Sequence, residues 1–221
     1  MRTRFLGDGG PEVSVVGLGT NNFGGRIDYE QSLAVIDAAL DEGVTLIDTA
    51  DIYGQGTSEE RIGRALEGRR DRVLIATKFG SPMGERPEER RGNPDYIRWA
   101  VEGSLRRLRA DAIDVYQMHE PDPVTPIEET LGALNDLVAD GKVRWIGSSN
   151  FSVEQIEAAE EFARGAGFHR FVSAQNEYSL LEREAEDDVL PACETLGIGF
   201  LPFFPLASGL LTGKYRRGEP S

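Results

Sequence analysis

The sequence contains few of the residues that form disulfides and metal sites. Cys193 is its only cysteine, so no intrachain disulfide can form, and a reducing, cytoplasmic location is expected. The two histidines, His119 and His169, lie far from each other and from Cys193 in the sequence, without the spacing of metal ligands, and no metal is expected.

Positive charge and long apolar runs are also scarce. The 24 lysines and arginines stand against 38 aspartates and glutamates, which gives a net charge of −14. Nucleic acids and anionic membranes bind basic patches, so neither is expected as a partner. The longest apolar runs, residues 13–18 and 198–206, are too short to cross a bilayer, and the first residues lack the apolar core of a signal peptide.

What the sequence does contain is a series of short apolar runs that are predicted as strands. They lack strict alternation with polar residues, which is typical of strands buried on both faces of a parallel sheet. A small hairpin over residues 2–6 and 12–15 is expected as well. The predicted strands are residues 13–16, 44–47, 73–76, 113–117, 143–146, 171–174 and 198–201.

Helix start signals lie between these strands. Each consists of a capping residue followed by a helix-favouring partner or a proline. The pairs are Asp28 with Gln31, Thr57 with Glu60, Asn93 with Pro94, Thr125 with Glu128, and Ser152 with Gln155. Strands that alternate with helices favour either a doubly wound sheet or a (β/α)8 barrel.

The positions of the polar residues favour the barrel. Side chains capable of chemistry follow the second to the sixth predicted strands, and a barrel gathers these strand ends into one mouth, whereas an open sheet spreads them along an edge. We therefore predict an α/β fold of the (β/α)8 TIM-barrel type. No proline- or serine-rich linker divides the sequence, residues 80–93 are predicted as a polar loop, and one domain over residues 1–221 is expected.

Four of these side chains form a candidate catalytic set. Asp48 and Tyr53 follow the second strand, Lys78 the third and His119 the fourth. A tyrosine titrates near ~10, so a buried lysine beside it is expected to bring its pKa closer to neutral pH. Asp48 is expected to keep Lys78 charged and oriented.

Each of these four residues alone is more often structural, as a cap, a packing residue, a solvated cation or a partner of a backbone carbonyl. Their occurrence at three consecutive strand ends favours catalysis. A barrel lyase or isomerase, with Lys78 as a Schiff-base nucleophile, is an alternative use of the same site.

Further motifs give the sequence a resemblance to a known family. From about residue 4 to residue 215, in the right order, it resembles the aldo-keto reductase superfamily. The motifs are residues 17–20 (GLGT), 48–54 (DTADIYG), Lys78, His119, 146–151 (IGSSNF), 175–178 (QNEY) and 205–210 (PLASGL).

The resemblance implies an (α/β)8 barrel that uses NADPH, less often NADH, to reduce a small aldehyde or ketone to an alcohol. It implies that Tyr53 is the general acid, that Lys78 and Asp48 tune it, and that His119 orients the carbonyl. It also implies a set of cofactor contacts, which are Gly19, Thr20, Asn22, Asp48, Ser148, Ser149, Asn150, Gln175, Phe203, Leu206 and Ser208. Phe204 departs from the family pattern, because it cannot donate the hydrogen bond of the serine found there in many members.

A second departure lies at the C-terminal end of the sequence. Family members usually continue through an eighth strand and the last helices, so these 221 residues are expected to form a barrel that lacks them. An alternative function is a nucleotide-binding regulatory subunit of the same fold without turnover. The complete catalytic set favours an enzyme, and it leaves the carbonyl substrate, the choice between NADPH and NADH and the oligomeric state open.

Overall fold

The chain begins with a two-stranded antiparallel hairpin, β1 (Thr3–Phe5) and β2 (Glu12–Ser14), as predicted. The computed structural model describes residues 1–84 and 91–215, so part of the predicted loop over residues 80–93 lies outside the described residues. The hairpin turn is tied to the rest of the fold, because Asp8 N–H donates to the carbonyl of Gly197 (2.7 Å) and the indole of Trp145 donates to the carbonyl of Gly9 (2.9 Å).

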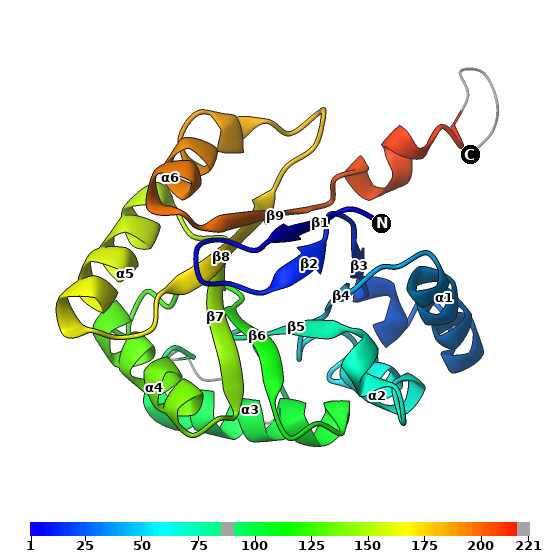
Figure 1. The fold of residues 1–221 in the computed structure, drawn as a ribbon, viewed down its shortest axis with the longest axis horizontal. Coiled ribbons are helices and arrows are strands. Elements are labelled where there is room, and N and C mark those ends of the chain that lie inside the picture. Colours follow the sequence, from blue (N-terminus) through cyan, green and yellow to red (C-terminus); the bar gives the residue numbers. More distant parts are fainter. Residues whose placement is uncertain (85–90, 216–221) are drawn as a thin grey trace.

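Seven parallel strands follow and pair in sequence order into one curved sheet (Figure 1). Strands that pair only with their neighbours along the chain, joined by helices, are the repeating unit of a (β/α) barrel. The sheet is a nearly closed barrel, which confirms the predicted fold. The strands are β3 (Gly17–Gly19), β4 (Leu46–Asp48), β5 (Leu74–Phe79), β6 (Ile113–Met118), β7 (Val143–Ser149), β8 (Phe171–Glu177) and β9 (Gly199–Phe203).

The helices lie outside this sheet and cover its outer face (Figure 1). The α-helices are α1 (Tyr29–Asp41), α2 (Thr57–Ala65), α3 (Pro94–Leu108), α4 (Ile127–Ala139), α5 (Val153–Ala166) and α6 (Val189–Leu196). The short 3-10 helices are η1 (Asn21–Gly24), η2 (Arg70–Arg72), η3 (Glu184–Glu186) and η4 (Ala207–Thr212). In the part of the chain that the structure describes, no helix is long and apolar enough to span a membrane.

The main core lies between the sheet and the helices. Ile36 of α1, Ile47 of β4 and Ile62 of α2 are almost completely buried in it. Burial of such a side chain contributes roughly 1.5–3 kcal/mol relative to exposure. A smaller cluster joins Leu6 and Val13 of the hairpin segment to residues of β4, β5 and β6. The hairpin therefore packs against the strands that carry the candidate site.

The first predicted strand is wrong. Residues 13–16 were expected to begin the barrel, but Val13 pairs with Arg4 in the hairpin. The first barrel strand is Gly17–Gly19, in which Gly17 pairs with Leu46 and Gly19 with Asp48. The physical reason is that the apolar side chain of Val13 packs in the small cluster under the sheet. A strand that consists mostly of glycine has no hydrophobic pattern that would mark it in the sequence.

All five predicted helices are present and begin within two residues of the predicted start, and three of the five predicted caps are confirmed. Asp28 and Ser152 form reciprocal capping boxes, and the Asn93 side chain accepts from Tyr96 N–H. The capping roles expected at Thr57 and Thr125 are wrong, although α2 does begin at Thr57. The cap of α2 is Gly56 and that of α4 is Pro126.

The two threonine hydroxyls have other partners. Thr57 donates to the carbonyl of Gly54, and Thr125 donates to the Asp122 carboxylate, both at 2.8 Å. Each hydroxyl is therefore directed at a partner other than a helix N–H, and neither caps its helix.

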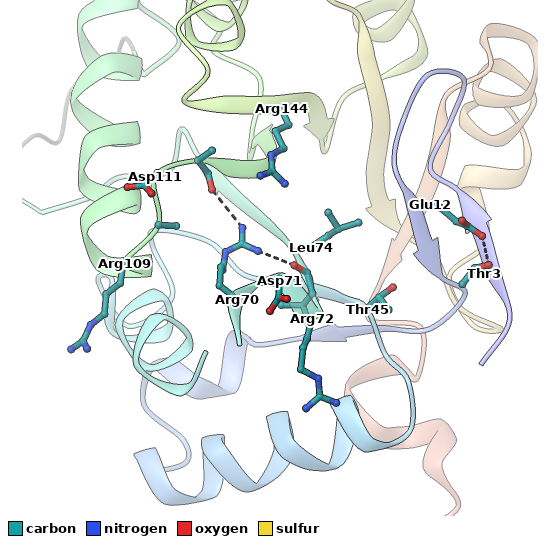
Figure 2. Close-up of a pocket in the computed structure, with 13 residues that line it drawn as sticks. Thr3, Glu12, Thr45, Arg70, Asp71, Arg72, Leu74, Arg109, Asp111 and Arg144 are labelled. Atoms are coloured by element: carbon teal, nitrogen blue, oxygen red, sulfur yellow. Dashed lines mark hydrogen bonds between the residues drawn. The ribbon is translucent and has the colours of Figure 1, made fainter. Parts of the chain in front are cut away.

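A cavity of about 820 Å³ lies at the N-terminal end of the sheet (Figure 2). Four arginines line it, but Arg70 and Arg144 both pair with the fully buried carboxylate of Asp114, and Arg109 pairs with Glu67. In barrels of this kind the N-terminal end of the strands supports stability, and the chemistry is at the other end. Asp114 and its two arginines therefore form a structural ion-pair cluster at this end of the sheet.

Candidate active site

The four candidate catalytic residues come from three neighbouring strands at the C-terminal end of the sheet. Asp48 is the last residue of β4, Lys78 lies in β5, and His119 follows β6, while Tyr53 lies in the loop between β4 and α2. The parallel pairing of β4 with β5 and of β5 with β6 brings these strand ends together. Because β5 continues past its predicted end to Phe79, Lys78 lies within the strand and not after it.

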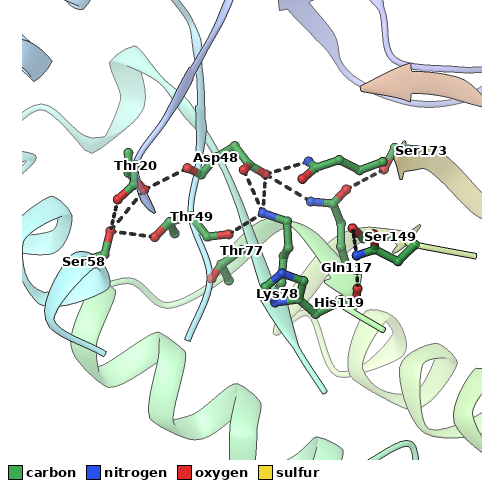
Figure 3. Close-up of polar contacts among 12 residues, drawn as sticks. Thr20, Asp48, Thr49, Ser58, Thr77, Lys78, Gln117, His119, Ser149 and Ser173 are labelled. Atoms are coloured by element: carbon green, nitrogen blue, oxygen red, sulfur yellow. Dashed lines mark hydrogen bonds and ion pairs between the residues drawn. The ribbon is translucent and has the colours of Figure 1, made fainter. Parts of the chain in front are cut away.

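Lys78 and Asp48 form a buried ion pair (Figure 3). The ammonium of Lys78 donates to Asp48 Oδ1 (2.9 Å) and Oδ2 (2.7 Å), and also to the carbonyl of Thr49 (2.9 Å). Lys78 is fully buried, and burial is the largest single effect and lowers its pKa, but Asp48 and Tyr53 together outweigh burial, so the pKa lies above its ordinary value. Lys78 is therefore held in its charged form beside Asp48 and Tyr53.

The half-buried ring of Tyr53 lies between this ammonium and the imidazole of His119. Lys78 Nζ is 5.3 Å from the centroid of the Tyr53 ring, and the ring of His119 meets it edge-on at 5.9 Å between centroids. Burial raises the pKa of Tyr53 above its ordinary value, and Lys78 opposes this effect without overcoming it. The expectation that Lys78 brings the pKa below its ordinary value is therefore wrong for this structure, because burial dominates.

His119 is neutral at physiological pH. Burial and the Lys78 cation lower its pKa to about 4, against an opposing effect of Asp48. Its Nδ1 is buried and has no hydrogen-bond partner within residues 1–84 and 91–215. The backbone carbonyl of His119 accepts from the Asn150 amide (2.9 Å), which ties the end of β6 to the end of β7.

Sequence analysis missed two polar residues inside the barrel, Gln117 and Ser173. Gln117 Nε2 donates weakly to Asp48 Oδ1 (3.4 Å), and Ser173 donates to Gln117 Oε1 (3.3 Å) (Figure 3). Both side chains are fully buried. A usable signal was present, because Gln117 is a polar residue in an apolar strand and pairs in register with Lys78.

A second network holds the backbone of Asp48. The hydroxyl of Thr20 donates to the carbonyl of Asp48 (2.8 Å), and the Ser58 hydroxyl donates to the Thr20 hydroxyl (3.1 Å). The hydroxyls of Ser58 and Thr49 also share a hydrogen bond of 2.9 Å. Thr20, a predicted cofactor contact, is fully buried and fixes the position of the Asp48 backbone.

Several of the other predicted cofactor contacts lie beside the ion pair. Gln175 Nε2 donates to Asp48 Oδ1 (2.9 Å), and Asn150 Nδ2 donates to the Ser149 hydroxyl (3.2 Å). Ser148 is buried, and its hydroxyl has no hydrogen-bond partner among the residues that the structure describes. The ends of β7 and β8 therefore bring amide and hydroxyl groups next to Asp48 and His119.

The rest of the predicted cofactor contacts lie further out. Asn22 is exposed in η1, and exposed Gly19 ends β3. Phe203 ends β9, and its ring meets that of Phe204 edge-on at 5.3 Å. Leu206 directly precedes η4 and Ser208 lies within it, and both are exposed. The carbonyl of Leu206 accepts from Gly209 and Leu211 N–H.

Comparisons with known proteins agree with this architecture. A family model described as "Aldo/keto reductase family" matches residues 15–221. "Aldo-keto reductase YhdN" from Bacillus subtilis (strain 168) is 45% identical over 220 residues, which are 97% of this chain and 65% of the relative. "Uncharacterized oxidoreductase YrpG" from the same organism is 44% identical over 225 residues, 97% of this chain and 69% of the relative.

The chain thus spans about two thirds of the length of these relatives. The family model nevertheless covers all seven strands of the sheet and every candidate catalytic residue. On this match and this identity, the chain belongs to the aldo/keto reductase family.

Proposed function

We propose that the protein is an NAD(P)H-dependent reductase that converts a small aldehyde or ketone into an alcohol, with Tyr53 as the general acid. The observation that carries this proposal is the grouping of Tyr53, the Lys78–Asp48 ion pair and neutral His119 at the C-terminal end of three adjacent strands. That end of a barrel is where catalytic residues gather.

The chemistry of Tyr53 suits proton donation. Because burial raises its pKa, the phenol stays protonated throughout the physiological pH range. When the substrate oxygen gains negative charge, Tyr53 Oη transfers its proton to that oxygen and becomes a phenolate. The Lys78 ammonium stabilises this phenolate, and Asp48 holds the ammonium in place.

His119 supports the same step without competing for the proton. A neutral imidazole has one N–H donor, and that donor can form a hydrogen bond to the carbonyl oxygen of the substrate. With a pKa of about 4, His119 is too weak a base to take the Tyr53 proton near pH 7. It orients and polarises the carbonyl, while Tyr53 supplies the proton.

A nicotinamide cofactor, when bound, supplies the hydride for this reaction. The polar groups beside the ion pair fit a carboxamide, which needs both donors and acceptors: Gln175, Asn150, Ser149 and the unpartnered hydroxyl of Ser148 among the described residues. We propose that Gly19, Thr20 and Asn22 also contribute to the cofactor site at the mouth of the barrel. Phe203 is proposed to stack on the nicotinamide ring, and Leu206 and Ser208 to contact the phosphates.

The residues over 1–84 and 91–215 form one barrel sheet with one layer of helices around it. This arrangement supports a single catalytic domain over residues 1–221. We propose NADPH as the cofactor, with NADH as the second choice.

Tyr53→Phe tests the proposal. The substitution removes the acidic proton and keeps the ring, so kcat for aldehyde reduction is expected to fall by about 10²–10⁴. NADPH binding, measured by protein fluorescence, is expected to stay within a few-fold of wild type. Equal turnover in the variant would contradict the role of Tyr53.

A further inference from the structure

A second buried carboxyl group lies behind the Tyr53–Lys78 pair. Asp51, in the loop between β4 and α2, is 1% exposed, and its backbone N–H donates to the carbonyl of Lys78 (3.1 Å). Asp51 therefore lies on a backbone segment that is tied to the strand carrying Lys78. Sequence analysis gave it no role.

The Asp51 side chain has little to stabilise a negative charge. Within the described ranges, neither of its carboxyl oxygens has a hydrogen-bond partner of good geometry, and the neighbouring backbone N–H of Ile52 is the one donor that acts on them. The hydroxyl of buried Tyr116 on β6 also lacks a partner there. A buried carboxylate with so few donors is unfavourable, whereas the neutral acid is tolerated.

Asp51 interacts with two titratable phenols, Tyr53 in its own loop and Tyr116 on β6, and with three charged side chains from neighbouring elements. The charged side chains are Glu59 on α2, Arg107 on α3 and Lys78 on β5. Both cations are already engaged, because Arg107 Nε donates to Glu59 Oε2 (2.7 Å) and Lys78 binds Asp48. The carboxylate of Glu59, which also accepts from Thr77 (2.6 Å), leaves negative charge next to Asp51.

Burial is the largest effect on the pKa of Asp51 and the negative charge of Glu59 the second, and together they raise it to about 8. Arg107, the backbone N–H of Ile52 and Lys78 oppose this shift, in that order. The group is therefore a neutral acid at pH 7 and loses its proton slightly above that pH. Ionised Asp51 in turn raises the pKa of Tyr53.

We propose that Asp51 is a positioning residue that, by losing or holding one proton, sets the charge behind the Tyr53–Lys78 pair and so controls how readily Tyr53 gives up its proton. The inference rests on the proposed function of Tyr53 and adds to it a regulating group that does not touch the substrate. With Asp51 neutral, Lys78 stabilises the Tyr53 phenolate unopposed from this side. With Asp51 ionised, its negative charge opposes the phenolate, and proton donation becomes slower.

The first test measures Asp51 itself and needs no turnover. Infrared difference spectra of the wild-type protein are expected to show a protonated-carboxyl C=O band near pH 7 that disappears with a midpoint near pH 8. Asp51→Asn is expected to lack this band. The control variant Asp95→Asn, whose side chain is exposed, is expected to keep it. A wild-type protein without the band, or an Asp51→Asn protein that retains it, overturns the proposal.

The second test measures the coupling to Tyr53, again without turnover. The ultraviolet absorption of tyrosinate is titrated in wild type and in Asp51→Asn, and the contribution of Tyr53 is identified by its loss in Tyr53→Phe. Removal of the Asp51 charge is expected to lower the tyrosinate midpoint by on the order of one pH unit. An unchanged midpoint overturns the proposal even if aldehyde reduction is confirmed.

The third test uses the pH profile of kcat. Wild type is expected to lose part of its activity across pH 8, while Asp51→Asn stays flat over that range. A purely structural role would lower kcat by the same factor at every pH, and that result contradicts the proposal.

If neither protein turns over any aldehyde, the proposed function fails, and the two titrations still decide the role of Asp51. If Asp51→Asn does not fold, Glu59→Gln replaces it. That variant removes the second cause of the shift and is expected to lower the midpoint of the infrared band, and an unchanged midpoint contradicts the inference.

Discussion

At the scale of single residues, the site is defined by how buried charges are compensated. Lys78 is fully buried, yet three hydrogen bonds to Asp48 and Thr49 satisfy its ammonium. The sequence allowed this pair to be predicted, because lysine is rare in this chain and Lys78 follows an apolar run. Asp51 was not predictable, because its character comes from Glu59, Arg107 and burial, which only the folded chain brings together.

Replacement of Lys78 by methionine tests the ion pair. The variant keeps the volume of the side chain but leaves Asp48 without its cation, and removal of one member of a buried pair costs about 3–5 kcal/mol of unfolding free energy. Urea denaturation at pH 7 measures this loss. The control is Lys142→Met, in an exposed pair with Glu102, where a change of ~1 kcal/mol or less is expected. Equal losses in the two variants would argue against a buried pair.

The pH dependence of stability provides a test of Asp51. Its pKa is raised from 3.8 to about 8, so the native state holds a proton that the unfolded state releases above pH 4. The stability contribution of Asp51 is therefore fully present below about pH 4 and is lost as the pH rises to 8. At about 1.4 kcal/mol per pKa unit, the loss amounts to several kcal/mol.

Asp51→Asn removes this proton linkage. Denaturation curves at pH 5 and at pH 8 are expected to show that the variant gains stability relative to wild type as the pH rises. A difference between the two proteins that does not change with pH would show that Asp51 has an ordinary pKa.

At the scale of elements, features set by residues close in sequence were predicted well, and features set by contacts between distant residues were not. The capping boxes of α1 and α5 involve residues three positions apart, so Asp28 and Ser152 were found from sequence. Thr57 and Thr125 carry the same local pattern, but their hydroxyls bind loop partners. The strand Gly17–Gly19 lacks a hydrophobic pattern, and its pairing with Leu46–Asp48 is what makes it a strand.

The cap of α1 is testable by a pair of substitutions on one helix. Asp28→Ala removes the acceptor for Gln31 N–H and is expected to cost about 0.5–2 kcal/mol. Asp41→Ala removes the same charge at the C-terminal end of α1, where an acidic residue is unfavourable, and is expected to be neutral or slightly stabilising. Chemical denaturation of both variants measures the difference, and equal effects would contradict the assignment of the cap.

At the scale of the whole molecule, the two ends of the sheet have different tasks. The predicted barrel placed the polar strand ends in one mouth, and the structure confirms that arrangement for Asp48, Lys78 and His119. The ion-pair cluster at the N-terminal end has no signal in the sequence, since Asp114, Arg70 and Arg144 are far apart along the chain. Their ion-pair cluster is produced by the pairing of β6 with its neighbours.

Asp114→Asn tests this division between the two ends. The carboxylate is fully buried and accepts from Ile75 N–H (2.8 Å) as well as from the two arginines. Because both arginines are partly exposed, loss of the carboxylate charge mainly weakens these hydrogen bonds and is expected to cost about 1.5–3 kcal/mol of unfolding free energy. NADPH affinity, measured at a temperature where the variant is folded, is expected to be unchanged. A large loss of affinity would show that the two ends are coupled.

The central claim is that the grouped residues reduce a carbonyl compound. Its most direct measurement is the steady-state consumption of NADPH by the purified protein with a panel of small aldehydes, followed by absorbance and by detection of the alcohol product. The account predicts aldehyde-dependent consumption of NADPH with an equal amount of alcohol formed. Tight NADPH binding without turnover of any aldehyde would contradict it and would favour a nucleotide-binding regulatory protein of the same fold.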